Sequence, residues 1–198
     1  MKKISTLFDI EYTGQISHIK RAVRLENLWV FFDPANVKAM RKLDGSACLI
    51  LDGNLYRRYD AKHGKVAPEN AIPCQPEADP ITGHHPHWIP IRVDDTDSRW
   101  HIDALGDIKL SDITNYYADG TYELIGEKVN SNREKITGHK LINHKSVFLN
   151  DLPILTMDTG FDIIKEYLST HDIEGIVFHH NDGRMCKIRK SDFNIKRG

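Results

Sequence analysis

The residues best suited to chemistry begin with a lysine beside an acidic turn. The segment 41–50 reads RKLDGSACLI, which places Lys42 two residues before Asp44 and just ahead of an expected strand. A lysine amine is a nucleophile only when it is neutral, a form that burial or a nearby cation favours. Gly45 follows, and a glycine lets the backbone approach a ligand closely. The alternative is an ordinary lysine ahead of an Asp-Gly turn.

A carboxylate stands among apolar residues further along the chain. Residues 121–129 read TYELIGEKV, with Glu123 between Tyr122 and Leu124. A carboxylate in such surroundings usually hydrogen-bonds a specific group, and a ribose hydroxyl is one such partner. The alternative is a glutamate on an edge strand that faces water.

The segment 174–190, EGIVFHHNDGRMCKIRK, predicts a hairpin that carries charge. A two-residue Asp-Gly turn at 182–183 is a strong hairpin signal and would place Ile176 opposite Arg189. Because side chains alternate between the two faces of a strand, one half-buried face would carry Glu174, Ile176, Phe178, Lys187 and Arg189. Two cations on such a face suit an anion such as phosphate. The alternative is a solvated face with a surface ion pair, which contributes little.

Two neighbouring arginines, Arg57 and Arg58, follow another Asp-Gly turn at 52–53. A two-residue turn would place Arg57 across from Cys48 and on the side of Lys42, whereas a three-residue turn would place Arg58 there. The residues alone leave both registers open.

Other familiar sites fit the chain less well. The glycines of residues 120–128 do not have the spacing of a phosphate-binding loop. Cys74, His84, His85 and His87 match no zinc pattern, so we expect these histidines to form local hydrogen bonds in a polar loop.

The composition is that of a globular protein of 198 residues, with 40% hydrophobic residues, 28% charged residues and a net charge of −1. This length predicts a single domain, 1–198. A net charge near zero excludes a generally basic protein, so any nucleic-acid site must be a local basic patch. Three cysteines without paired spacing indicate a reduced environment. Without a long apolar run or a signal-peptide core, we expect a cytoplasmic protein that does not enter the membrane.

Mainly antiparallel strands must position these residues. We expect a hairpin of residues 47–51 and 55–60, further strands at residues 28–32, 87–93 and 121–129, and a short helix at 36–41. Pro90 marks 87–93 as an edge strand, and residues 61–86 form a long loop. The clearest helix is 160–170, with Thr159 at its N-cap and an apolar stripe of Phe161, Ile164 and Leu168. The pattern predicts an α+β fold dominated by antiparallel sheet, with few helices.

The order of these motifs resembles that of the covalent nucleotidyltransferases, a superfamily of RNA ligases, DNA ligases and mRNA capping enzymes. The matching motifs are Lys42-Leu43-Asp44-Gly45, Tyr122-Glu123, Glu174-Gly175 and Lys187-Ile188-Arg189. The chain is also similar, over nearly its whole length, to small ATP-dependent RNA ligases of phages and bacteria, a family that includes the vertebrate 5′-to-3′ RNA ligase. The stretches that carry this likeness are TLFDIEY, KLDGSAC, RYDAK, DPITGHHPHWIPI, TYELIGEKVNSN and EGIVFHHNDGRMCKIRKSDF. The family's Arg-x-Asp pattern favours Arg58 over Arg57, and Arg189 replaces the second lysine of its terminal motif.

The resemblance implies a nucleotidyltransferase fold and three chemical steps. Lys42 attacks ATP to form a lysyl-adenylate, AMP passes to an RNA 5′-phosphate, and a 3′-hydroxyl then seals the strand. The implied roles are nucleotide contacts for Gly45 and Arg58, orientation of the Lys42 region by Asp44, ribose binding by Glu123, and phosphate binding by Lys187 and Arg189, both of which also favour a neutral Lys42. Glu174 would contact the nucleotide and help to hold Mg²⁺, with Mn²⁺ as a possible substitute. Asn130, Asn132 and Arg133 are candidate RNA contacts.

Three other functions remain open. DNA ligases and capping enzymes normally continue past the terminal lysine motif into an OB-fold domain, whereas only residues 191–198 follow here. We therefore expect an RNA ligase type without an OB-fold domain. A catalytically silent module that binds nucleotides or RNA ends is the third alternative, although such a module has no need of Lys42.

Overall fold

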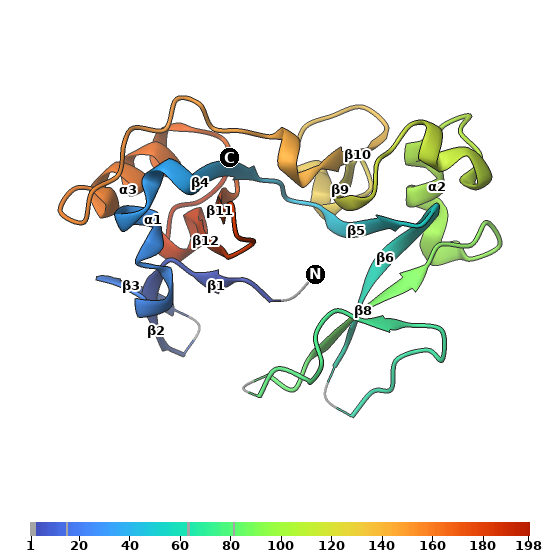
Figure 1. Ribbon diagram of the computed structural model, residues 1–198, viewed down its shortest axis with the longest axis horizontal. Helices are drawn as coiled ribbons and strands as arrows, with labels where there is room; N and C mark the ends of the chain where they lie inside the picture. Colours follow the sequence, from blue (N-terminus) through green and yellow to red (C-terminus); the bar gives the residue numbers. More distant parts are fainter. Residues whose placement is uncertain (1–2, 15, 63, 81) are drawn as a thin grey trace. The chain divides into compact units, whose positions relative to one another are not determined.

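The computed structural model describes residues 3–14, 16–62, 64–80 and 82–198 (Figure 1). Its contacts fall into two compact units. Unit 1 contains Lys3 and Asp44–His144, and unit 2 contains Ile4–Leu43 and Lys145–Gly198. The chain therefore passes from one unit to the other three times, after Lys3, after Leu43 and after His144. A single functional domain over 1–198 stays a prediction.

Unit 1 is built on a six-stranded sheet in which every pair is antiparallel (Figure 1). The strand order is β10 (His139–Asn143), β9 (Gly120–Gly126), β5 (Ser46–Leu51), β6 (Asn54–Ala61), β8 (His85–Pro90) and β7 (Ile72–Pro73). Helix α2 (Arg99–Leu105) packs against β10 and β9. One face of the sheet is apolar and forms a core that includes Cys48, Ile50, Leu55, Ile113, Leu124 and Leu141.

The first predicted hairpin of unit 1 is confirmed. Leu51 lies opposite Asn54, so the turn contains two residues. Asp52 and Gly53 both have positive φ, at 49° and 74°, which is the conformation of the two-residue turns that best match strand twist.

Unit 2 contains a four-stranded sheet in the order β1 (Ser5–Thr6), β12 (Met185–Arg189), β11 (Gly175–His180) and β4 (Val37–Lys42) (Figure 1). Only β1 pairs in parallel with its neighbour. A separate two-stranded ribbon consists of β2 (Phe8–Thr13) and β3 (Ile16–Val23). The core of this unit includes Leu7, Phe8, Ile164, Leu168, Ile176, Phe178, Cys186 and Ile188. Mostly antiparallel sheets with three α-helices in the described residues confirm the α+β class.

The long helix of unit 2 is confirmed as α3 (Gly160–Thr170). Ile164 and Leu168 are fully buried in the core, and Phe161 packs against it. Thr159 occupies the N-cap position, but its side chain makes no capping hydrogen bond. The 3.6-residue period of apolar side chains was therefore the reliable signal for this helix.

Two predictions near the start of unit 2 were wrong. Residues 28–32 do not form a strand, because helix α1 (Trp29–Phe32) occupies this run. A short apolar run has no periodicity that separates a strand from a buried helix. The predicted helix at 36–41 is strand β4, which pairs with β11 along its whole length. Its local propensity was overridden by this long-range pairing.

The prediction of an edge strand at 87–93 was also wrong. Strand β8 begins at His85, ends at Pro90, and has β6 on one side and β7 on the other. The two-residue strand β7 lies within the long predicted loop and covers the edge of β8. Pro90 is tolerated because it is the last residue of the strand.

The register predicted for the last hairpin was wrong by one residue. Gly175 lies opposite Arg189 and Val177 opposite Lys187, so Ile176 does not face Arg189. The loop contains three residues, 181–183, with Gly183 at φ 94°, a common alternative to the two-residue turn. A slip of one residue moves each side chain to the other face. Ile176 and Phe178 therefore belong to the core with Ile188, while Lys187 and Arg189 lie on the opposite face.

In the described residues, no helix is both long enough and apolar enough to cross a membrane.

Candidate active site

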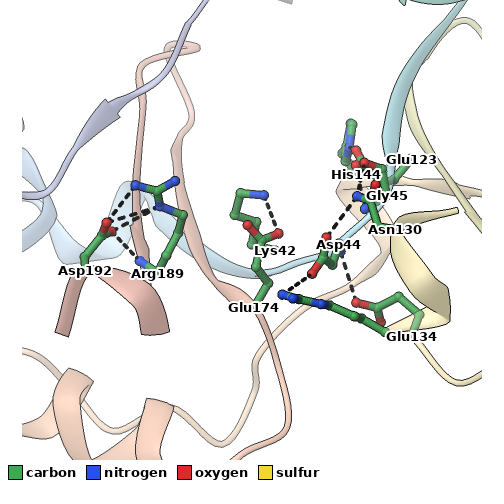
Figure 2. Close-up of polar contacts among 11 residues, drawn as sticks. Lys42, Asp44, Gly45, Glu123, Asn130, Glu134, His144, Glu174, Arg189 and Asp192 are labelled. Atoms are coloured by element: carbon green, nitrogen blue, oxygen red, sulfur yellow. Dashed lines mark hydrogen bonds and ion pairs between the residues drawn. The ribbon is translucent and has the colours of Figure 1, made fainter. Parts of the chain in front are cut away.

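In unit 2, the amine of Lys42 is paired with the carboxylate of Glu174. Lys42 is the last residue of β4, and Glu174 immediately precedes β11. Lys42 Nζ lies 2.5 Å from Glu174 Oε2 (Figure 2). Both side chains are partly exposed, at 24% and 22%. The structure therefore joins two predicted site residues that are 132 positions apart in the chain.

The strand pairing of the unit 2 sheet also places Lys187 and Arg189, the other two predicted cations, on the face of Lys42. Gly175 pairs with Lys42 on one side and with Arg189 on the other. Paired residues point to the same face, so Lys42 and Arg189 share a face, with a glycine between them. Lys187 is two residues before Arg189 and lies on this face as well. A Cβ on Gly175 would lie 2.3 Å from the carbonyl oxygen of Ile188.

The charges on this face act on one another. Burial and, after it, the positive charges of Arg189 and Lys42 lower the pKa of Lys187 to about 8, against the opposing effect of Glu174 and Asp192. Burial disfavours the charged form of an amine, and like charges nearby do the same. The grouping of Glu174, Lys187 and Arg189 is thus present, although the register from which it was predicted was wrong.

Arg189 is held in place by Asp192, a residue that the sequence analysis did not identify. The Arg189 guanidinium donates from Nη2 to Asp192 Oδ1 at 2.7 Å (Figure 2). The backbone N–H of Arg189 donates to Asp192 Oδ2 at 2.8 Å. Asp192 is 1% exposed. A buried carboxylate needs such partners, and its spacing of three residues after a strand cation is the only sequence signal for it.

In unit 1, the Asp44-Gly45 segment is fastened by the loop after β9. Asn130 Nδ2 donates to Asp44 Oδ1 and to the Gly45 carbonyl, each at 2.9 Å. The Asp44 N–H donates to Glu134 Oε1 at 3.0 Å (Figure 2). Arg133 lies 3.6 Å from the Asp44 carboxylate. The Asp44-Gly45 segment is therefore held both by the Asp44 side chain and by the backbone groups of Asp44 and Gly45.

These contacts bear on the predicted RNA-binding residues. Asn130 and Arg133 contact Asp44. Asn132 donates from Nδ2 to the carbonyl of Ile136 at 3.0 Å and closes its own loop. A role of these three side chains in RNA binding stays a prediction, and the contacts seen are intramolecular.

Glu123 is 8% exposed and has its carboxylate within the same network. Its Oε1 accepts from the Gly45 N–H at 3.1 Å, and its Oε2 lies 2.8 Å from Nε2 of His144 (Figure 2). A Cβ on Gly45 would lie 2.2 Å from the carbonyl oxygen of Leu124. The close approach that Gly45 permits is thus to β9 of its own chain. His144 was missed because a lone histidine after a strand carries no motif.

The two neighbouring arginines point to opposite faces of the unit 1 sheet. Arg57 pairs with Cys48, which belongs to the core face, and it lies 3.4 Å from Asp97. Arg58 therefore points to the other face, which also carries Glu123, because Glu123 pairs with the neighbour of Cys48. The turn has two residues, and Arg57 lies opposite Cys48 as that register predicts. Arg58 lines a cavity of about 230 Å³.

The histidines of the long loop form local contacts. His85 Nε2 lies 2.8 Å from the carbonyl of Gln75, and His87 Nδ1 lies 2.8 Å from that of His85. His84 lies 3.5 Å from Asp60 beside the Arg58 cavity. In the described part of the chain, no group of three or more His, Cys, Asp or Glu residues could hold a metal ion by itself.

Comparison with known proteins adds a family likeness to this geometry. Residues 103–197 match the RNA ligase 1 family. The RNA ligase 1 of Pongo abelii is 26% identical over 164 residues, which cover 66% of this chain. The alignment covers 49% of that relative, so the chain spans about half the length of the curated relative that it matches. Both comparisons show a similarity of this chain to RNA ligases.

The match to the RNA ligase 1 family covers only part of the candidate site. It includes Glu123, Glu174, Lys187, Arg189 and the newly found Asp192. Lys42, Asp44, Gly45 and Arg58 lie before the matched residues, so their roles rest on the motif and on the contacts described above.

Proposed function

We propose that this chain is an ATP-dependent RNA ligase that works through a covalent lysyl-adenylate. The observation that carries the proposal is the pairing of Lys42 with Glu174 on a sheet face that also holds Lys187 and Arg189. An amine, a carboxylate and two further cations are the groups needed to bind a phosphate and attack it. The likeness to the RNA ligase 1 family supports RNA as the polymer.

In the first step, the Lys42 amine attacks the α-phosphorus of ATP. A nitrogen–phosphorus bond forms, the bond from the α-phosphorus to the pyrophosphate oxygen breaks, and pyrophosphate leaves. An ammonium has no lone pair to offer, so Lys42 must lose a proton before the attack, and the Glu174 carboxylate that accepts its hydrogen bond could take that proton. Lys187 and Arg189 would stabilise the charge that develops on the α-phosphate.

The carboxylate of Glu174 suits a hard divalent cation that also binds phosphates. Mg²⁺ usually takes one or two protein carboxylates, and phosphates and waters complete its coordination. Glu174 would hold Mg²⁺, or Mn²⁺ in its place, and the bound metal would neutralise phosphate charge. In the described residues, no group of three or more His, Cys, Asp or Glu side chains could hold a metal ion, so the remaining ligands would have to come from the nucleotide and from water.

The unit 1 residues would bind the rest of the nucleotide. Glu123 offers a nearly buried carboxylate to a ribose hydroxyl, and Arg58 lies on the same face of the sheet. Only Leu43 separates Lys42 from Asp44 in the chain. Asp44 and Gly45 are held by contacts within unit 1.

The later steps would use RNA ends. AMP would pass from Lys42 to an RNA 5′-phosphate, which becomes an RNA-adenylate. A 3′-hydroxyl would then attack that phosphate, join the two ends and release AMP.

The first step can be tested directly. The protein is incubated with α-labelled ATP or GTP and Mg²⁺, and the label is followed on a denaturing gel. We expect label from ATP in the wild type and none in Lys42→Ala. Peptide mapping of the adenylated protein should place AMP on Lys42. The control position is Lys187, another amine on this face, because its lowered pKa makes it the rival nucleophile.

Each other outcome has a definite meaning. AMP on Lys187 would reassign the nucleophile. Label from GTP alone would indicate the capping type of nucleotidyltransferase, and no label from either nucleotide would leave a silent binding module. Sealing of 5′-phosphorylated RNA against DNA then tests the polymer, and preferential sealing of DNA would indicate a DNA ligase.

A further inference from the structure

Among the described residues, the His144 side chain makes one hydrogen bond, and its partner is Glu123. Nε2 of His144 lies 2.8 Å from Glu123 Oε2, and the His144 side chain is 16% exposed. Its Nδ1 is buried and has no hydrogen-bonding partner among the described residues. An ionised carboxylate only accepts, so Nε2 carries the proton. A ring that leaves one nitrogen unsatisfied is poorly explained by packing alone, which directs attention to its contact with Glu123.

Glu123 binds groups near both ends of the long unit 1 segment, Asp44–His144. Its Oε1 binds the N–H of Gly45, which is two residues after the passage at Leu43, and its Oε2 binds His144, the last residue of that segment. Strand β9 lies between β5 and β10, which is why one side chain reaches both. The carboxylate is therefore held by one donor on each oxygen.

Two donors on two oxygens fix the plane of a carboxylate. A carboxylate has about four lone-pair sites, so two remain for a ligand, and their directions are set once the plane is set. Without His144, only the Gly45 bond would remain on Oε1, and the group could rotate about it. A ligand would then have to order the group itself, which weakens binding.

We infer that His144 is a positioning residue that holds Glu123 for a ribose hydroxyl and thereby makes the site prefer ribonucleotides over deoxyribonucleotides. The inference rests on the proposed function, because it takes Glu123 as the ribose contact. His144 itself does not touch the nucleotide in this assignment. It acts as the outer partner of a binding carboxylate, a kind of residue whose loss commonly reduces activity about 10- to 100-fold in metal sites.

The test compares self-labelling by ATP with self-labelling by 2′-deoxy-ATP. In His144→Phe the ring volume is kept and the bond to Glu123 is lost. We expect the preference for ATP, measured as the ratio of the two kcat/KM values, to fall about tenfold, which is the size expected for one interaction of about 1.4 kcal/mol. His144→Gln places an amide N–H near the position of Nε2 and should restore most of the preference. His144→Asn is too short to do so and serves as a second loss variant if the Phe variant does not fold.

Two controls separate positioning from general damage. His139 lies in β10 and is paired with Asp103 at 2.6 Å, so His139→Gln alters a comparable pair away from Glu123 and should leave the ratio unchanged. In a Glu123→Ala background, His144→Phe should have no further effect on the ratio.

The outcomes are distinct. If the wild type takes label from neither nucleotide, the proposed function fails and takes this inference with it. If the wild type is labelled but His144→Phe slows both nucleotides by the same factor, His144 has only a structural role and the inference alone is overturned. An additional loss of preference in the Glu123→Ala background would overturn it as well.

Discussion

Lys42 and Arg189 lie in one cross-strand row of the unit 2 sheet, with Gly175 between them. Gly175 places no side chain between the two cations. This arrangement suits a tetrahedral phosphate that both cations contact. It also explains why a glycine is required at a position with no unusual φ, since a Cβ would collide with the backbone of β12.

We predict that Gly175→Ala disrupts both the sheet and the site. The added Cβ would lie 2.3 Å from the Ile188 carbonyl oxygen, so strands must separate. The free energy of unfolding should fall by about 1–3 kcal/mol or more, measured by urea denaturation, and self-labelling should be lost. Gly198→Ala is the matched control, since a Cβ there meets nothing within 4 Å. Wild-type stability in Gly175→Ala would contradict the close contact.

Removing the charge of Glu174 should separate catalysis from stability. The pair with Lys42 is partly exposed, so Glu174→Gln should change the free energy of unfolding by only about 1 kcal/mol. Self-labelling should fall at least about 100-fold if Glu174 holds the metal, a loss typical of an electrostatic group in an active site. Gel assays over a range of Mg²⁺ and Mn²⁺ concentrations measure this effect. Asp172→Asn, a nearby exposed carboxylate, should label normally.

The lowered pKa of Lys187 predicts how binding and stability depend on pH. With a pKa of about 8, Lys187 loses its charge as the pH rises through 8, so ATP affinity measured by calorimetry should decline there. The contribution of Lys187 to the free energy of unfolding should instead rise with pH. Between pH 8 and 10.5 the unfolded state binds more protons than the folded state, so this group makes unfolding less favourable as pH rises.

An arginine at the same position tests this pH dependence. Lys187→Arg stays charged throughout this range, so its ATP affinity should remain level above pH 8. Lys165→Arg on α3, where the side chain is exposed, should keep the wild-type profile. The same decline in Lys187→Arg as in the wild type would assign the titration to another group.

Arg189 should not be replaceable by lysine, even though the related motif carries lysine there. The guanidinium bonds Asp192, and a lysine would keep the charge but not the forked geometry. We expect Arg189→Lys to lower self-labelling about tenfold, consistent with the loss of one charged hydrogen bond. Asp192→Asn should lower it similarly, and the double variant should be less than additive. Full activity in Arg189→Lys would show that charge alone suffices.

Asn130 offers a test of the contacts that fasten the Lys42 motif. Its φ is 44°, so alanine would add backbone strain to the loss of the amide. Asn130→Gly tolerates this φ and removes only the two hydrogen bonds to Asp44 and Gly45. We expect Asn130→Gly to lower the free energy of unfolding by about 1–2 kcal/mol and to slow self-labelling. If labelling is unaffected in Asn130→Gly, the loop does not control the position of Asp44.

The sequence by itself determined the fold class, the helix α3 and the residues that could do chemistry. The 3.6-residue spacing of apolar side chains identifies α3, and the Asp52-Gly53 turn identifies the hairpin of β5 and β6, because both signals come from residues close together in the chain. The motif series likewise selected Lys42, Glu123 and Glu174 without any knowledge of distances. Prediction failed for short segments. Residues 28–32 form a helix because so short an apolar run has no periodicity that separates helix from strand, and residues 36–41 form a strand because pairing with β11 outweighed local preference.

Only the tertiary structure decided which groups meet and on which face. One extra residue in the last hairpin loop moved Lys187 and Arg189 away from the core side chains predicted to accompany them, because each step along a strand reverses the side chain. Pairing across the sheet placed Arg58, not Arg57, on the face of Glu123. The partner His144 became visible only through its contact, since a hydrogen bond to Glu123, which is 21 residues away in the chain, leaves no periodic signal in the sequence. Asp192 lies only three residues from Arg189, but the structure was needed to show that the two side chains pair.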